Sequence, residues 1–126
     1  MQVLVVGETP LSIEDVVAVA RQEKSVALPV STEWRDLIQR GADFLDQLLQ
    51  DEGVIYGVTT GYGDSCLVEI PAHQVNELPL HLSRFHGCGL GQNLDLNTAR
   101  AVLVTRLCSL ARGYSSVSHA LLERLT

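Results

Sequence analysis

Apolar residues recur at helical spacing in the first half of the chain and predict two amphipathic helices there. Ser12 begins a Ser-Ile-Glu-Asp run that is typical of a helix N-terminus, and a helix of about two to three turns is expected after it. A longer pattern predicts a helix over residues 32–50, with Gly53 placed to end it. The stripes expected to face a core are Ile13, Val16, Val17 and Ala20 in the first helix, and Trp34, Leu37, Ile38, Leu45, Leu48 and Leu49 in the second.

The second half of the chain shows the same kind of pattern. Residues 73–85 are compatible with a helix, within the limit that Pro79 sets. A nearly unbroken apolar run predicts a long helix over 96–112, with Asp95 as its N-cap. Apolar residues over 117–125 predict a last short helix.

Two short valine-containing runs, residues 2–6 and 25–30, read as β-strands, and Pro29 suggests that the second is an edge or an ending strand. Glycines interrupt the chain at 55–66 and again at 86–91, at a density that no helix tolerates. Glycines so spaced indicate positive φ or a close backbone approach. The pattern therefore predicts an α+β fold that is mainly helical.

Composition narrows the class of protein. With 126 residues and 13.7 kDa, the chain has the size of a single domain, 1–126. The net charge of -6 argues against nucleic acid and anionic membranes as partners. There is no signal-like or membrane-spanning apolar run, and the three cysteines form no disulfide pattern. A cytoplasmic protein is the expectation.

Common catalytic and binding motifs are poorly represented. The glycine-rich loops lack the residues of a P-loop or a dinucleotide fingerprint. The histidines and cysteines show no zinc-site spacing, so no metal is expected. Among the candidate catalytic residues, Tyr56 stands out because it lies at the start of a glycine-rich loop. It is either a packing residue or a phenol that acts as an acid or base.

Three segments stand out together, at residues 55–63, 82–91 and 106–117. The run Ile55-Tyr-Gly-Val-Thr-Thr-Gly-Tyr-Gly63 is similar to the N-terminal active-site loop of one family, the histidine and aromatic amino-acid ammonia-lyases, with Tyr62 in place of the usual Phe. Residues 82–91 resemble the family's Ser-His-Ala-Ala-Gly-Val-Gly segment, and 106–117 its Ser-Leu-Ala-Arg-Gly segment. The resemblance covers essentially the whole chain, and it implies an ammonia-lyase-like fold.

The resemblance also implies an activity and a site. Family members eliminate ammonia from an L-amino acid to give an α,β-unsaturated acid, using a built-in electrophile, methylidene-imidazolone (MIO). The family's proton-carrying tyrosine corresponds to Tyr56, and the loop glycine beside which the substrate approaches corresponds to Gly63. The substrate-selecting pair corresponds to Phe85 and His86. The pair is mixed: His86 favours a polar ring, whereas Phe at the position of Phe85 is typical of phenylalanine-specific members. Histidine, tyrosine and phenylalanine therefore all stay open as substrates.

The MIO-forming Ala-Ser-Gly triplet does not occur in these residues. Because family members are several times longer and form tetramers, the chain is expected to be the N-terminal segment of a lyase, cut before the triplet and the helical bundle. By itself this segment is expected to be inactive. One alternative is a standalone truncated relative that acts as a non-catalytic binding or interaction module; another is a fragment without function.

Overall fold

The computed structural model describes residues 2–51 and 53–126, which fall into two compact units. The first unit holds residues 2–45 and 93–126, and the second holds 46–51 and 53–92. Each unit is described by itself below. The expectation that 1–126 forms a single domain stays a prediction.

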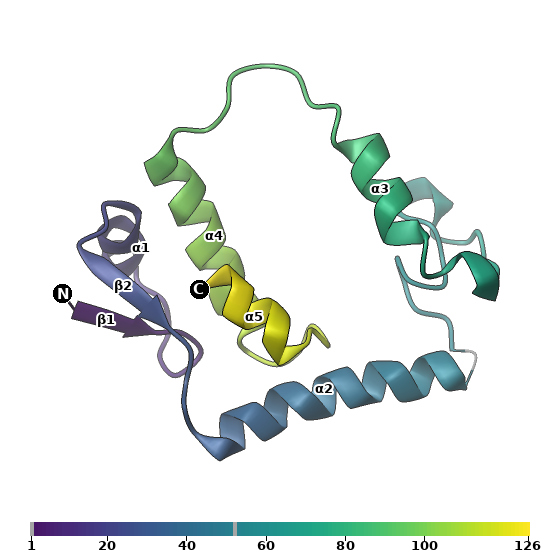
Figure 1. Ribbon diagram of the computed structural model, residues 1–126, viewed down its shortest axis with the longest axis horizontal. Helices are drawn as coiled ribbons and strands as arrows, with labels where there is room; N and C mark the ends of the chain where they lie inside the picture. Colours follow the sequence, from purple (N-terminus) through teal and green to yellow (C-terminus); the bar gives the residue numbers. More distant parts are fainter. Residues whose placement is uncertain (1, 52) are drawn as a thin grey trace. The chain divides into compact units, whose positions relative to one another are not determined.

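The first unit begins with a β-α-β arrangement. Strand β1 (Gln2–Val5) pairs in parallel with β2 (Lys24–Ala27), in the register Gln2 to Lys24, and helix α1 (Ile13–Ala20) connects them. Figure 1 shows the two strands side by side with α1 next to them. The sequence predicts β2 over 25–30, but the strand ends at Ala27, two residues before Pro29, which has no N–H to donate to a neighbouring strand.

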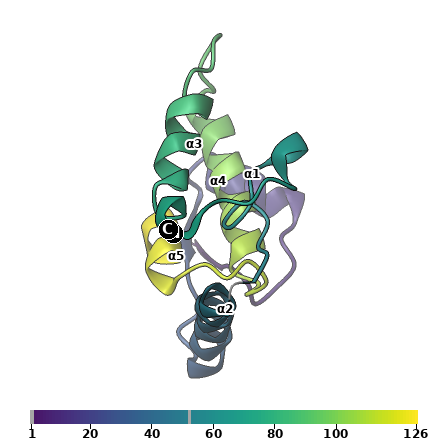
Figure 2. The same ribbon diagram turned by 90° about the vertical axis from the view of Figure 1, so that its right-hand side faces the viewer.

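Three further helices belong wholly or partly to this unit. Helix α2 (Thr32–Gln50) has the bounds that the periodicity predicted, and its first part lies in the first unit. Helix α4 (Leu96–Leu110) begins after the predicted N-cap, where the Asp95 carboxylate accepts the N–H groups of Asn97 and Thr98. Helix α5 (His119–Leu125) lies beside the C-terminal part of α4 in both views (Figure 1 and Figure 2).

One hydrophobic core holds the first unit together. Its tryptophan, Trp34, anchors the start of α2 by donating its indole N–H to the Ala111 carbonyl oxygen at 2.9 Å. This bond satisfies a polar atom that burial would otherwise leave unpaired. The buried members of the core come from β1, from the residue that follows it, and from helices α1, α2, α4 and α5 with the C-cap of α4: Leu4, Val6, Val19, Trp34, Ile38, Val104, Leu107, Leu110, Ala111 and Leu122.

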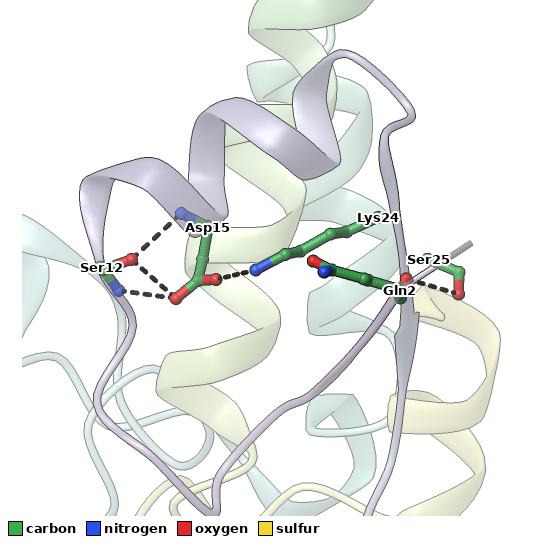
Figure 3. A network of polar contacts seen from close by, with 5 residues as sticks. All are labelled: Gln2, Ser12, Asp15, Lys24 and Ser25. Carbon is green, nitrogen blue, oxygen red and sulfur yellow. Dashed lines mark hydrogen bonds and ion pairs between the residues drawn. The ribbon is translucent and has the colours of Figure 1, made fainter.

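A polar network fixes the start of α1 (Figure 3). The Ser12 hydroxyl accepts the Asp15 N–H at 3.1 Å, and the Asp15 carboxylate in turn accepts the Ser12 N–H, which is a capping box. The Lys24 ammonium donates to Asp15 Oδ1 at 2.7 Å. The hydrogen bond from Lys24, followed by those from Ser12, lowers the pKa of Asp15 to about 2, from an ordinary value of 3.8.

This network predicts an acid-dependent loss of stability. Because the Asp15 pKa is lower in the folded chain, its contribution is complete above pH 3.8 and is lost as the pH falls toward about 2. We therefore expect Asp15→Asn to flatten the dependence of the unfolding free energy on pH across that window, measured by urea denaturation. Glu14→Gln, an exposed acid in the same helical turn, is the matched control and should keep the original dependence. Parallel curves for the unmodified chain and Asp15→Asn would contradict the prediction.

The second unit consists of loops, two short 3₁₀ turns (η1, Gly63–Ser65, and η2, Ala72–Gln74) and helix α3 (Leu78–His86). Pro79 limits the start of this helix, as the sequence suggested. It stands in the first turn, where a missing backbone N–H costs nothing, and the helix runs on from it to His86. The helix expected over 73–85 therefore begins only at Leu78, and residues 72–74 form η2 instead.

The fold class is confirmed as α+β and mainly helical. The face predicted for α1 is confirmed at Ala20, which is buried, and at Val16, which packs against the core, but it is wrong at Ile13 and Val17, which are 80% and 39% exposed. Val19, outside the predicted stripe, is buried as well. Within the described ranges, no helix is both long enough and apolar enough to cross a membrane.

Candidate active-site loop

The loop around Tyr56 is closed by its two adjacent threonines. The Thr59 hydroxyl accepts the Ile55 N–H at 2.8 Å and donates to the Gly53 carbonyl oxygen at 3.0 Å. A single side chain thus ties the beginning of the loop to its middle. Such local bonds from threonine hydroxyls replace the backbone pairing that a loop lacks.

Thr60 closes the part of the loop that follows Tyr56. Its buried hydroxyl accepts the Gly57 N–H at 3.1 Å and donates to the Gly61 carbonyl oxygen at 3.0 Å. The loop also pairs with the chain that follows: Gly61 N–H donates to the Val68 carbonyl at 3.0 Å, and a bridge joins Thr60 to Glu69. The loop is therefore held by hydrogen bonds rather than by an apolar core.

Tyr56 and Gly63 are brought together by this arrangement. The Gly63 N–H donates to the Tyr56 phenol oxygen at 3.1 Å, across seven positions of sequence. Gly63 has a φ of +57°, which favours glycine, and a Cβ at this position would have no atom within 4 Å. Because the Gly63 N–H supplies the proton of this hydrogen bond, the O–H proton of Tyr56 points in another direction. Tyr56 is 64% exposed.

Phe85 and His86 lie in the last turn of α3, before the C-cap Gly87. Their rings meet edge-to-face with centroids 4.7 Å apart, and both side chains are exposed. In the part of the chain that the structure describes, no hydrogen bond or ring contact joins either residue to Tyr56 or Gly63. The structure thus joins Tyr56 to Gly63 and Phe85 to His86, as two pairs of the predicted site.

Sequence reasoning missed the residues that shape the loop. Thr59 and Thr60 hold it closed, and Tyr62 packs its ring edge-to-face against Tyr56, with centroids 6.2 Å apart. A Thr-Thr pair inside a glycine-rich run was the available signal, because hydroxyls in such loops commonly bond to nearby backbone.

The metal-capable side chains form no centre within residues 2–51 and 53–126, where no group of three or more His, Cys, Asp or Glu could hold an ion. The cysteines are free. Burial, followed by the charge of Asp15, raises the pKa of the Cys108 thiol, while the Cys88 thiol donates to the Phe85 carbonyl oxygen at 3.0 Å. The raised pKa of Cys108 is the opposite of what an activated thiolate nucleophile requires.

The mainly helical fold and the glycine-rich tyrosine loop define an ammonia-lyase-like segment. The sequence model described as aromatic amino acid lyase matches residues 11–126, and the chain belongs to this family. It is 36% identical over 115 residues to the histidine ammonia-lyase of Clostridium tetani, covering 91% of this chain and 22% of that protein. Identity to the Streptococcus pyogenes histidine ammonia-lyase is 35% over 119 residues, covering 94% and 23%.

Solved structures agree with this assignment. The tyrosine aminomutase of Streptomyces globisporus superimposes with a TM-score of 0.87 at 35% identity, over 99% of this chain and 23% of that one. The histidine ammonia-lyase of Trypanosoma cruzi gives a TM-score of 0.78 at 25% identity, over 99% and 23%. The chain therefore spans less than a quarter of the length of these relatives, and the expected ammonia-lyase-like fold is confirmed.

Proposed function

We propose that this chain is the N-terminal segment of an ammonia-lyase that acts on L-histidine or an aromatic L-amino acid and releases the α,β-unsaturated acid. The observation that carries the proposal is the hydrogen bond from the Gly63 N–H to the Tyr56 phenol oxygen. It holds an exposed phenol in one place, inside the loop that matches the family's active-site motif.

Tyr56 acts as the proton carrier in this proposal. In the elimination, the Tyr56 phenolate accepts the β-proton and becomes a neutral phenol, the C–H electron pair forms the double bond, and the amino group leaves with the electron pair of the carbon–nitrogen bond. A proton acceptor must lie within hydrogen-bond reach of that proton, so a fixed phenol position matters more than its burial. Gly63 contributes its N–H and the open space where a side chain would stand, which lets a substrate approach the backbone.

Phe85 and His86 are proposed to select the substrate. A phenylalanine ring offers an apolar wall, and a histidine offers a hydrogen bond to a polar ring. A site that hydrogen-bonds a ring N–H or OH discriminates against a ring that lacks it. This argument places histidine and tyrosine ahead of phenylalanine.

The residues of this chain do not fit the family's electrophile, because the Ala-Ser-Gly triplet from which MIO forms is absent from all 126 positions. MIO supplies the electrophile that takes up the amino-acid substrate. These residues contribute only the loop, the proton carrier and the selecting pair, so we propose that the segment by itself is inactive. Homotetramer formation and a cytoplasmic location are further parts of the proposal.

The missing triplet also supports a second candidate, a standalone relative that binds a ligand or partner without catalysis. The two proposals differ in the size of the native protein. A lyase must include the triplet, whereas a binding module of this size has no electrophile.

The intact mass of the protein from its source separates the two. We expect a mass several times 13.7 kDa, as in relatives of which this chain covers about 22%. The purified protein should then convert histidine or tyrosine faster than phenylalanine, measured by the ultraviolet absorbance of the unsaturated acids. A native mass near 13.7 kDa would overturn the lyase proposal in favour of the binding module.

A further inference from the structure

Tyr62 faces Tyr56 across the glycine-rich loop. The two rings meet at an interplanar angle of 84°, with centroids 6.2 Å apart. This is the edge-to-face geometry that aromatic pairs prefer, in which the positive edge of one ring meets the negative face of the other. Because Tyr56 is 64% exposed, this ring contact is an important restraint on its orientation.

The backbone at Gly57 makes room for the Tyr62 ring. A Cβ at position 57 would lie 2.6 Å from Tyr62 Cε1 and 3.1 Å from Cδ1, and Gly57 has a φ of +72°. A side chain at this position would have to displace the ring. The glycine that follows Tyr56 therefore leaves the space in which Tyr62 packs.

Tyr62 is also covalently next to the amide that holds the phenol oxygen. Its backbone is extended, with φ -111° and ψ 154°, and it directly precedes η1. Gly63 then donates to Tyr56 Oη at 3.1 Å. The Tyr56 side chain is thus held at two points, at the ring by the side chain of Tyr62 and at the oxygen by the next peptide unit.

We propose that Tyr62 is a positioning residue for Tyr56: its ring, seated over Gly57, sets the orientation in which the phenol oxygen meets the Gly63 N–H. That the Tyr62 ring orients Tyr56 follows from these contacts alone, whereas the consequence for catalysis rests on the proposed function. The ring does the positioning, so the Tyr62 hydroxyl is dispensable for it.

Amide hydrogen exchange at Gly63, measured by NMR on the 126-residue chain, tests the geometry. Tyr62→Leu removes the aromatic edge and is expected to speed exchange at Gly63 by roughly 2- to 10-fold, as Tyr56→Phe does by removing the acceptor. Tyr62→Phe keeps the ring and should retain the slow exchange. Gly57→Ala, which pushes the ring aside, should resemble Tyr62→Leu.

Two reporters show whether a variant has simply unfolded. The Gly61 amide, bonded to the Val68 carbonyl, reports on the loop, and the Trp34 indole N–H, bonded to the Ala111 carbonyl, reports on the first unit. Both should exchange as before in Tyr62→Leu. Unchanged exchange at Gly63 would overturn the proposal. Faster exchange at Gly61 as well would also overturn it, because Tyr62 would then support the whole loop.

Kinetics of the complete enzyme test the catalytic consequence. Tyr62→Leu should lower kcat with little change in KM, and Tyr62→Phe should rescue kcat. An equal loss in both variants would overturn the positioning role. If the complete enzyme shows no lyase activity at all, the proposed function fails, while the exchange at Gly63 still decides whether Tyr62 positions Tyr56.

Discussion

Replacing Tyr56 with phenylalanine in the complete enzyme is expected to lower kcat by about 10²- to 10⁴-fold, the usual contribution of a positioned acid–base group. The variant keeps the ring and its edge-to-face contact with Tyr62 but loses the oxygen that accepts the Gly63 N–H. Because binding contacts elsewhere are unchanged, KM should move much less than kcat. Steady-state assays that follow the unsaturated product measure both constants.

Tyr114→Phe is the matched control for this experiment. Tyr114 is 86% exposed in the first unit, where its ring lies 6.0 Å from the Arg112 guanidinium carbon. The same loss of one phenolic oxygen there should leave kcat within about twofold, because the Tyr114 oxygen has no part in the proposed chemistry. Full activity in Tyr56→Phe would remove Tyr56 from the mechanism and leave it as a residue that packs the loop.

Replacing Ile38 with alanine is expected to lower the unfolding free energy by about 2–5 kcal/mol. Ile38 is 1% exposed and belongs to the core that joins the start of α2 to α4 and α5. The substitution removes buried methyl groups and leaves a cavity that the close-packed surroundings fill only in part. Urea denaturation followed by the fluorescence of Trp34, which lies in the same core, measures the loss.

Phe44→Ala provides the comparison on the same helix. Phe44 loses a larger side chain but is 62% exposed, so its removal should change stability by no more than about 0.5 kcal/mol. Equal losses in the two variants would mean that the burial of Ile38 does not govern the stability of the first unit.

Local signals in the sequence predicted the helices well. The bounds of α2 follow from one long amphipathic period, and the start of α4 follows from Asp95, whose carboxylate caps the helix as expected. The pKa of the Asp95 carboxyl is lowered, mainly by the hydrogen bond from the Thr98 side chain and next by the one from the Thr98 backbone N–H. Capping and periodicity depend on neighbours within one or two turns, which the sequence contains.

The buried face of α1 could not be obtained in the same way. The helix is apolar on more than one side, and the side that becomes buried depends on what packs against it. Helix α4 and strand β2 contact α1, and they bury Val19 together with the predicted Ala20, while Ile13 and Val17 stay exposed. The partner that selects the face lies about eighty residues away in the sequence, so no local pattern contains this information.

The sequence by itself determined the family, the fold class and the residues of the glycine-rich loop, because these are recorded in motifs and in local periodicity. Tertiary structure decided which of those residues meet. The contact of Tyr56 with Gly63, and of the Tyr62 ring with both Tyr56 and the space at Gly57, results from a loop closed by Thr59 and Thr60. Such distances depend on the backbone angles of the loop and on the hydrogen bonds that close it, and a list of residue types does not specify them.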